Sequence, residues 1–375
     1  MKEKFSLKDH LFNETKVTYL TALLVKADKK FKAEAFVCDI MSELLELELK
    51  DRIRWIATVL ADYLPKDYEK AVRVIIKALP PPLDPTKTDN DFGEFIFAPF
   101  GEFVATHGVT KERLVVSLEA IKELTKRFSM EDAIRYFLRA FPKETLRVMK
   151  EWAKDENYHV RRLVSEGTRP LLPWSGRVPL SSADTLPLLN TLHADKTRYV
   201  TRSVANHLND IAKKEPAMVI KTLKSWQTLG KQKESELNWM IKHALRTRIK
   251  SADREALALL GYGAEKPKQV SLTVTPTRVA AGGVCVLEME VVTAKNASLL
   301  IDYRIHFKKK NGTTAPKVFK WKMINVSGGE VLRLQKRHTF KADATTFTLY
   351  PGEHVVDVQI NGQICATSAF TLILD

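Results

Sequence analysis

The sequence predicts a two-part protein: repeated helices over residues 1–262, followed by a β-sandwich over residues 269–375. Three observations support this fold class. Hydrophobic residues recur with a helical period before Gly261 and alternate with a period of two after Lys268. Segments about 40 residues apart resemble one another within the first part. A glycine-rich segment separates the two patterns. The predicted class is therefore multidomain, with an all-α part and an all-β part.

The repeat is clearest in two stretches that begin at Asp155 and Asp195. A third copy follows at the same step, and the matched positions are Asp155 with Asp195, Val160 with Val200 and Met240, Arg162 with Arg202 and Lys242, and Val164 with Val204 and Ala244. A period near 40 with two helices per unit is typical of a HEAT-like repeat solenoid. The second helix of each unit is expected to line its concave surface.

Charge indicates the class of partner. The chain has 60 Lys and Arg against 45 Asp and Glu, a net charge of +15, which favours nucleic acid or an acidic membrane surface. An apolar N-terminal signal region and a membrane-length apolar run are both missing from the sequence, so we expect a cytoplasmic protein. Cys38, Cys285 and Cys365 are far apart and in apolar contexts; we expect buried, reduced thiols and no metal site.

Before residue 143 the pattern predicts helices separated by one long loop. Apolar residues recur at helical spacing over 36–47, 53–63 and 71–79, and the prolines from Pro80 to Pro85 end this array. The aromatic segment 92–104 is interpreted as core packing between helices. Helices are predicted over 110–128 and 129–141, the second with Ser129 as its N-cap and Glu131 or Asp132 in its first turn. From Lys143 the repeats continue to Leu260, and Gly261–Lys268 is expected to be a linker.

About seven strands are predicted in the second part, near residues 270–275, 284–292, 299–307, 317–322, 331–340, 352–360 and 369–374. Asn311-Gly312 and Asn361-Gly362 suit type I′ hairpin turns. Seven short strands in this length indicate an immunoglobulin-like sandwich. Lys308, Lys309 and Lys310 stand at one hairpin; they are either a solvated turn or a phosphate-binding hairpin.

Basic residues recur on the predicted helices of the repeats. Val160, Leu163 and Val164 should face the neighbouring repeat, while Arg161 and Arg162 should point elsewhere. A cationic groove would match the backbone of a duplex, whereas the alternative is ordinary solvated surface charge. The candidate DNA-binding residues are Arg161, Arg162, Arg169, Arg198, Arg202, Asn206, Lys242 and Arg246, with Lys308, Lys309 and Lys310 in the sandwich.

Glu166 stands out because it follows this basic helix and precedes the segment that leads to Trp174. One explanation is structural: an ion pair with Arg162 or Arg169 that orients the guanidinium. The other is catalytic, since a carboxylate beside a deoxyribose stabilises the oxocarbenium-like cation that forms when a glycosidic bond breaks. Trp174 would then offer a π face to that cation or to a cationic base.

At these residues the chain resembles the AlkC group of DNA alkylation repair glycosylases. The resemblance covers about residues 5–262 and rests on the linked segments 124–135, 160–174 and 203–211. It departs from the family pattern at Tyr136 and Leu171. The resemblance implies a HEAT-like solenoid that holds DNA. Some members carry a C-terminal immunoglobulin-like domain that helps to hold the DNA.

The resemblance also implies an activity: removal of cationic N-methylated bases, such as 3-methylcytosine, 1-methyladenine and 3-methyladenine, from double-stranded DNA without full base flipping. By position, Glu166 is the catalytic carboxylate, Glu131 a second acidic site residue and Trp174 a residue near the lesion. We expect a monomer that needs no metal or organic cofactor. The alternative function is a non-enzymatic helical scaffold that binds nucleic acid or protein.

Overall fold

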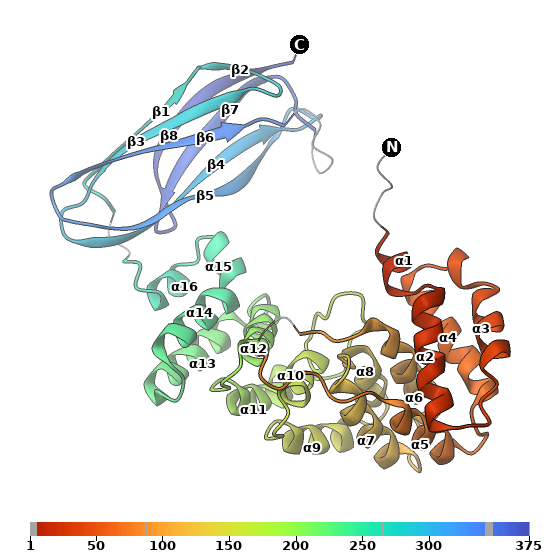
Figure 1. Ribbon diagram of the computed structural model, residues 1–375. Coiled ribbons are helices and arrows are strands. Elements are labelled where there is room, and N and C mark those ends of the chain that lie inside the picture. The colour runs from red at the N-terminus through yellow and green to blue at the C-terminus, as the bar shows by residue number, and fades with distance from the viewer. Residues whose placement is uncertain (1–5, 88, 90, 264–265, 342–347, 375) are drawn as a thin grey trace. The chain divides into compact units, whose positions relative to one another are not determined.

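The computed structural model describes residues 6–87, 89, 91–263, 266–341 and 348–374. Helices come first and strands second, as expected (Figure 1). The α-helices are α1 (Leu7–Leu11), α2 (Glu14–Ala27), α3 (Ala33–Met41), α4 (Leu49–Tyr63), α5 (Tyr68–Ala78), α6 (Ala98–Gly108), α7 (Leu114–Thr125), α8 (Glu131–Ala140), α9 (Pro142–Trp152), α10 (Tyr158–Gly167), α11 (Ser182–Leu192), α12 (Arg198–Ile211), α13 (Pro216–Leu229), α14 (Glu234–Ala244), α15 (Arg246–Lys250) and α16 (Arg254–Leu259), and the short 3-10 helices are η1 (Leu44–Glu46) and η2 (Phe95–Phe97).

The strands are β1 (Gln269–Thr275), β2 (Arg278–Ala280), β3 (Val284–Val292), β4 (Ala297–Lys308), β5 (Thr314–Val326), β6 (Val331–Thr339), β7 (Gly352–Ile360) and β8 (Gln363–Ile373). The chain packs into two compact units. One unit comprises residues 1–214 and 229–244, and the other comprises residues 215–228 and 245–375. Each unit is described separately below.

Helix starts follow the sequence where a short polar residue caps the first turn. A side-chain oxygen accepts a backbone N–H of the first turn at Asn13, Asp67, Asn157, Ser181 and Asp253. The prediction that Ser129 caps α8 is wrong. Met130 is the N-cap residue, and the Ser129 hydroxyl bonds the side chains of Glu131 and Arg162 instead. The start of α8 is therefore tied to α10 by side chains.

In the first unit, alternate helices pack against one another in sequence order: α4 on α6, α6 on α8, α8 on α10, α10 on α12 and α12 on α14. The apolar positions of the repeat lie in these contacts. Val160, Val164, Val200, Val204 and Met240 are all fully buried. The helical period therefore identified the packing faces correctly. The packing of α8 on α10 and of α10 on α12 places these three helices in one row. This row carries the site described below.

An acidic residue near the start of each of three successive repeats makes an ion pair with the preceding repeat. Lys122 Nζ lies 2.8 Å from Asp155 Oδ2, Arg161 Nε lies 2.5 Å from Asp195 Oδ2, and Arg198 pairs with Glu236. The expectation that Arg161 points away from the neighbouring repeat is therefore wrong. Its guanidinium joins the two repeats, and it also donates to the carbonyls of Asp155 and Glu156.

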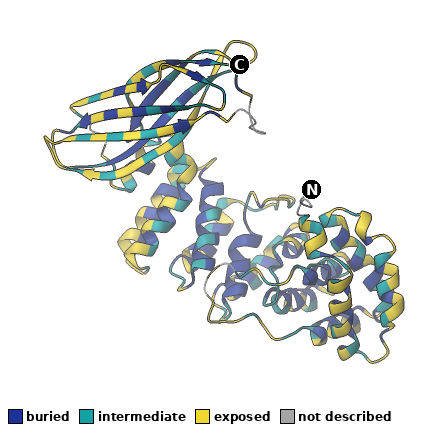
Figure 2. Cartoon of the chain, turned by 45° about the horizontal axis from the view of Figure 1, so that its top comes forward, coloured by how far each residue is buried: buried dark blue, intermediate teal, exposed yellow. Residues whose placement is uncertain are grey.

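The second unit contains the sandwich. One sheet has the order β1-β3-β6, and the other has the order β2-β8-β7-β4-β5. Along β3, Cys285, Leu287 and Met289 are buried while Glu288 and Glu290 are exposed, the alternation expected of a half-buried strand. Buried and exposed residues also alternate along strands of the sandwich in Figure 2. The three-residue β2 was not predicted. It pairs in parallel with β8, and so short an edge strand leaves too few residues for a period.

The two Asn-Gly pairs differ. Asn361 and Gly362 join β7 to β8 with φ angles of 46° and 81°, as a type I′ turn requires. Only Gly312 of the other pair has a positive φ, at 78°, and the Lys309 N–H bonds the Thr313 carbonyl across a longer loop. A type I′ turn at Asn311-Gly312 is therefore wrong.

Within this unit, the chain that precedes the sandwich contacts the turn between β7 and β8. Asn361 Nδ2 donates to the Gly263 carbonyl at 3.1 Å. A Cβ at Gly362 would lie 2.9 Å from the Ala252 carbonyl oxygen, so only glycine permits this approach. Ala264 and Glu265 of the expected linker lie outside the described residues. The described part of this segment is thus anchored to the sandwich.

Two expectations about burial are wrong. Of the three cysteines expected to be buried, Cys38 is exposed and Cys365 is only partly buried, whereas Cys285 is buried. Phe92 is 47% exposed and does not belong to the core, although Phe97, Phe100 and Phe103 of the same aromatic segment do. Across the described residues, none of the helices combines the length and the hydropathy needed to span a membrane.

Asp302 in β4 gives a prediction about stability. The residue is 4% exposed, its Oδ1 lacks a hydrogen-bond partner among the described residues, and burial raises the pKa of its carboxyl to about 6. A raised pKa favours folding at low pH, and this contribution is lost as the pH rises toward and through 6. Asp302→Asn should therefore gain stability over the native protein by on the order of 1–2 kcal/mol between pH 4 and pH 7.5, allowing for solvent screening. Urea unfolding at both pH values measures this, and an advantage independent of pH would contradict it.

Candidate active site

Two carboxylates and one guanidinium meet where α8, α10 and α12 pack together. Arg162 of α10 lies between the two acids: its Nη1 is 2.7 Å from Glu131 Oε2, and its Nη2 is 3.7 Å from Glu166 Oε2. Ser203 of α12 donates to Glu166 at 2.6 Å. The three helices thus hold Glu131 and Glu166 on opposite ends of one cation.

Arg162 is buried against aromatic rings. Its guanidinium carbon lies 4.5 Å from the ring centre of Tyr199 and 5.6 Å from that of Phe92. Although burial disfavours the charged form, Glu131 and Glu166 hold the pKa of Arg162 above its ordinary value. Arg162 therefore stays charged and keeps the two carboxylates from repelling each other.

Glu166 is 5% exposed, and both of its oxygens are engaged. Arg169 donates to Oε1 at 2.6 Å, and Arg169 is itself bonded to Asp210 at 3.0 Å. Burial raises the pKa of Glu166, but Arg162, Arg169 and Ser203 together bring it below its ordinary value. The carboxylate is therefore ionised at neutral pH. The predicted ion pair of Glu166 with Arg162 or Arg169 is present, with both arginines.

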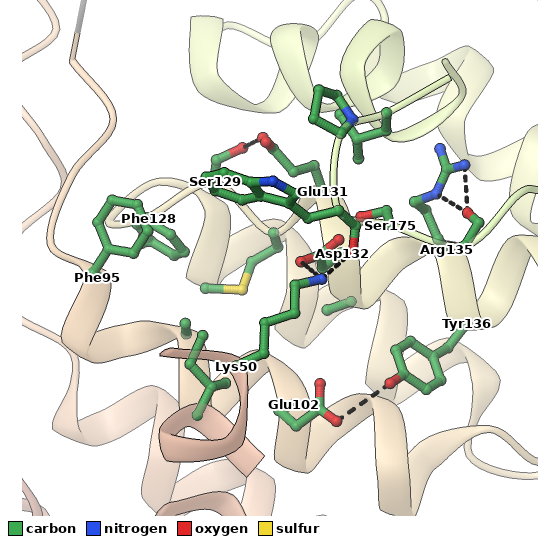
Figure 3. Close-up of a pocket in the computed structure, with 18 of the residues that line it drawn as sticks. Lys50, Phe95, Glu102, Phe128, Ser129, Glu131, Asp132, Arg135, Tyr136 and Ser175 are labelled. Carbon is green, nitrogen blue, oxygen red and sulfur yellow. Dashed lines mark hydrogen bonds and ion pairs between the residues drawn. The ribbon is translucent and has the colours of Figure 1, made fainter. Parts of the chain in front are cut away.

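A cavity of about 290 Å³ adjoins this group of side chains. Figure 3 shows Glu131, Asp132 and Arg135 of α8 around it, with Lys50 of α4, Glu102 and Tyr136. Glu131, whose side chain is 28% exposed, lines the cavity; Glu166 does not line it but is paired with the same guanidinium. The lining also includes several aromatic residues, among them Phe92, Phe95, Phe128 and Trp174.

Trp174 projects from the segment between α10 and α11. Its side chain is 80% exposed, yet its backbone has a φ of 62°, a left-handed conformation that bulky residues rarely adopt. Lys50 donates to the Trp174 carbonyl and also pairs with Asp132 at 3.3 Å. The indole is thus placed at the cavity by backbone anchors. Carboxylates and an exposed π face at one cavity can stabilise a cation that develops on a bound molecule.

The arginines predicted to bind DNA occupy two kinds of environment. Arg161, Arg162 and Arg169 are buried and ion-paired, so each is held by protein groups. Arg202 is half-buried and pairs with Asp89, and Arg198 pairs with Glu236 and stacks on Trp239 at 3.9 Å.

The other predicted residues are more accessible or bonded to side chains. Lys242, Arg246, Lys309 and Lys310 are exposed. Asn206 bonds His243 at 2.8 Å. Lys308 is half-buried and its Nζ lies against Gly352, where an added Cβ would be 2.5 Å from it. Among all the predicted residues, the structure groups only Glu131, Glu166, Arg162, Arg169 and Trp174 around the cavity or its acidic pair.

Several residues of this site were not identified from the sequence: Lys50, Arg135, Tyr199, Ser203 and Asp210. One signal was available, because Ser203 is one residue after Arg202, the repeat match of Arg162, and so lies on the next helix of the row. The others come from distant segments, and only the packing of α4, α8 and α12 reveals them.

Comparison with known proteins covers both parts of the chain. A family model described as DNA alkylation repair enzyme matches residues 128–247, the stretch that contains Glu131, Glu166 and Trp174. A second model, described as the C-terminal Ig-like domain of the uncharacterised protein YhaZ, matches residues 268–374.

Two relatives match over nearly their whole length. The uncharacterized protein YhaZ of Bacillus subtilis (strain 168) is 31% identical over 359 residues, which covers 94% of this chain and 96% of that protein. The Pseudomonas fluorescens alkylpurine DNA glycosylase AlkC, solved bound to DNA containing an abasic site analog, is 31% identical. That match covers 98% of this chain and 100% of the other, with a TM-score of 0.84.

Proposed function

The chain belongs to the AlkC family of DNA alkylation repair glycosylases, and from this premise we propose that it removes cationic N-methylated bases from duplex DNA. The proposed substrates are 3-methylcytosine, 1-methyladenine and 3-methyladenine. The reaction is hydrolysis of the N-glycosidic bond, which yields a free base and an abasic site. The observation that carries the proposal is the acidic pair on Arg162 beside the exposed Trp174, in a chain similar to AlkC over its whole length.

The chemistry fits these residues. A base with a fixed positive charge leaves as a neutral molecule, so the enzyme does not need a strong general acid. The difficult part is the positive charge that develops on the sugar. Two carboxylates held on one guanidinium are suited to stabilise that charge and to orient the attacking water. Trp174 would place its π face beside the sugar or the cationic base.

We propose further that the base is not fully flipped out of the duplex. The exposed indole of Trp174 and the shallow position of Glu131 favour contact with the sugar. Flipping a base out of the duplex costs unstacking energy, and a labile, cationic base can be released without this step. The catalytic roles follow: Glu166 and Glu131 supply negative charge, and Trp174 contacts the lesion.

Trp174→Ala tests the role of the indole. Loss of a partly desolvated cation–π contact of about 2 kcal/mol should slow base release roughly thirtyfold. Because the side chain is 80% exposed, stability should change by no more than about 0.5 kcal/mol. Single-turnover excision and thermal unfolding measure the two quantities, and Trp174→Phe should retain part of the rate. Full activity in the alanine variant would remove Trp174 from the site.

Arg202→Ala tests the contact with the duplex backbone. Arg202 is half-buried and shares its charge with Asp89, so exchange of that partner for a phosphate is feasible. Loss of one phosphate contact should lower the slope of log Kd against log salt by about one. Fluorescence anisotropy over a salt series measures it. An unchanged slope would place the duplex elsewhere.

The function itself is tested with duplexes that carry a single 3-methylcytosine, 1-methyladenine or 3-methyladenine. We expect the free base in solution and an alkali-labile abasic site in the strand. An undamaged duplex and a 7-methylguanine duplex serve as comparisons. Binding without release of any base would favour the scaffold function instead.

A further inference from the structure

We infer that Arg135 is the positioning residue of this site: its guanidinium holds both ends of the segment that carries Trp174 and, through Arg169, sets Glu166. The inference rests on the proposed function for its kinetic test only. Arg135 lies in the middle of α8, is 1% exposed, and is one of the residues that line the cavity (Figure 3).

The geometry of the guanidinium is that of a clamp. Nη1 donates to the Gly167 carbonyl at 2.8 Å and to the Arg169 carbonyl at 2.9 Å. Nε and Nη2 both donate to the Gly176 carbonyl, at 2.9 and 2.7 Å. The Gly167 carbonyl belongs to the last residue of α10, the Arg169 carbonyl lies two residues beyond it, and the Gly176 carbonyl follows Trp174 by two residues. One planar group therefore fixes where the segment leaves α10 and where it returns.

Close packing makes this contact possible. A Cβ at Gly167 would lie 2.6 Å from Ile134 Cγ2, so α8 and α10 approach each other at a position that needs glycine. Carbonyls at the end of a helix lack partners within the helix, and buried carbonyls must be satisfied. Arg135 supplies the donors for Gly167 and Arg169 and uses the remaining side of its fork for Gly176.

The tip of the segment has little packing of its own. Trp174 is 80% exposed, and its left-handed backbone is held by Lys50 on one side and by the Arg135–Gly176 contact on the other. Arg169, whose carbonyl Arg135 holds, donates its own side chain to Glu166. A displaced segment would therefore move the indole and the partner of the buried carboxylate together.

Arg135 has a counterpart elsewhere in the helical part that can serve as a control. All four of its hydrogen bonds go to backbone carbonyls, and burial lowers the pKa of its guanidinium to about 10. Arg52 of α4 makes the same kind of contact elsewhere. It is fully buried and donates to the carbonyls of Lys8, Phe12, Leu45 and Leu47, with Asp9 as an ion pair. Arg52 is thus a matched control that leaves segment 167–176 untouched.

The test compares Arg135→Lys with Arg52→Lys in the full-length protein. Lysine keeps the charge, but its ammonium cannot reach three carbonyls with a planar fork. For Arg135→Lys we expect single-turnover release of 3-methylcytosine at saturating enzyme to fall roughly tenfold to a hundredfold. The half-saturating enzyme concentration should stay near the native value. Arg52→Lys should keep the native rate at a temperature where both variants are folded.

Chemical rescue adds a second readout. In Arg135→Ala, added methylguanidinium should restore part of the rate, because it can occupy the vacated site and donate to the same carbonyls. Sodium at equal ionic strength should not restore it. A native rate in Arg135→Lys would overturn the inference, as would an equal loss of rate in Arg52→Lys.

A measurement without catalysis separates this inference from the proposed function. The protein has six tryptophans, which can be labelled with 5-fluorotryptophan. The ¹⁹F resonance of Trp174 is identified by its disappearance in Trp174→Phe. It should shift or broaden in Arg135→Lys and stay in place in Arg52→Lys. If no lesion is excised by the native protein but this shift is seen, the proposed function fails and the positioning role stands; an unchanged resonance overturns the positioning role.

Discussion

Glu166→Gln should lower base release at least about a hundredfold, because a preorganised charge beside the developing cation contributes on the order of 3–4 kcal/mol to the transition state. Glutamine keeps the shape of the side chain and its contact with Ser203, so the change removes mainly the charge. Duplex binding should stay near the native value, since Glu166 is only 5% exposed. Single-turnover excision and anisotropy measure the two effects.

Asp155→Asn is the matched control for this variant. Asp155 is a half-buried acid of the repeat and is bonded to Lys122 at 2.8 Å. Burial raises the pKa of its carboxyl, but Lys122 and the Asn157 N–H outweigh burial, so the pKa is below its ordinary value, as for Glu166. Asp155 does not line the cavity. We expect it to retain the native rate. If Glu166→Gln kept near-normal excision, the carboxylate would be a purely structural partner of Arg162 and Arg169.

Arg162→Leu should destabilise the helical part by about 3–5 kcal/mol, the usual cost of leaving a buried ion pair without one partner. The change leaves Glu131 and Glu166 facing each other with the cation between them removed. Adding Glu131→Gln should recover part of the loss, because it removes one of the two like charges. Urea unfolding followed by far-ultraviolet circular dichroism measures these differences.

Arg202→Leu provides the contrast at the matching position of the next repeat. Its side chain is 27% exposed and its partner Asp89 is 36% exposed, so the loss should be about 0–1 kcal/mol. A similar loss in both variants would mean that burial of Arg162 contributes nothing beyond a surface pair. Full stability of Arg162→Leu would show that the acidic pair does not depend on this cation.

The fold was largely predictable because its two periods are local properties of the sequence. Buried Val160 and Val164 on α10, and alternating Cys285, Leu287 and Met289 on β3, stand where the patterns placed them. The family resemblance is confirmed by the full-length match to AlkC. The predictions about Ser129 and Phe92 are wrong because a single side-chain contact decides the position of each residue. Ser129 bonds Glu131 and Arg162 instead of capping α8, and Phe92 leaves the core to contact Arg162.

The sequence nominates Glu131, Glu166 and Trp174 as site residues, and these roles stay predictions; it does not reveal the environment of their side chains. Sequence shows that Arg161, Arg162 and Arg169 are charged; it does not show that they are buried and paired with carboxylates from other segments of the chain. Nor does it reveal Ser203, which reaches Glu166 only because α10 and α12 pack together. Whether a charged side chain is buried depends on which oppositely charged groups pack beside it. Here those groups lie tens of residues away in the sequence.

The backbone of Trp174 has a consequence for how this chain can evolve. A left-handed conformation costs a bulky residue about 1–3 kcal/mol, whereas glycine occupies it without penalty. Selection for thermal stability alone would therefore favour glycine or asparagine at this position. With the proposed role of Trp174 in base release, the tryptophan at this position trades stability for activity. Among diverged relatives, a glycine at this position would identify chains that have kept the fold and given up the reaction.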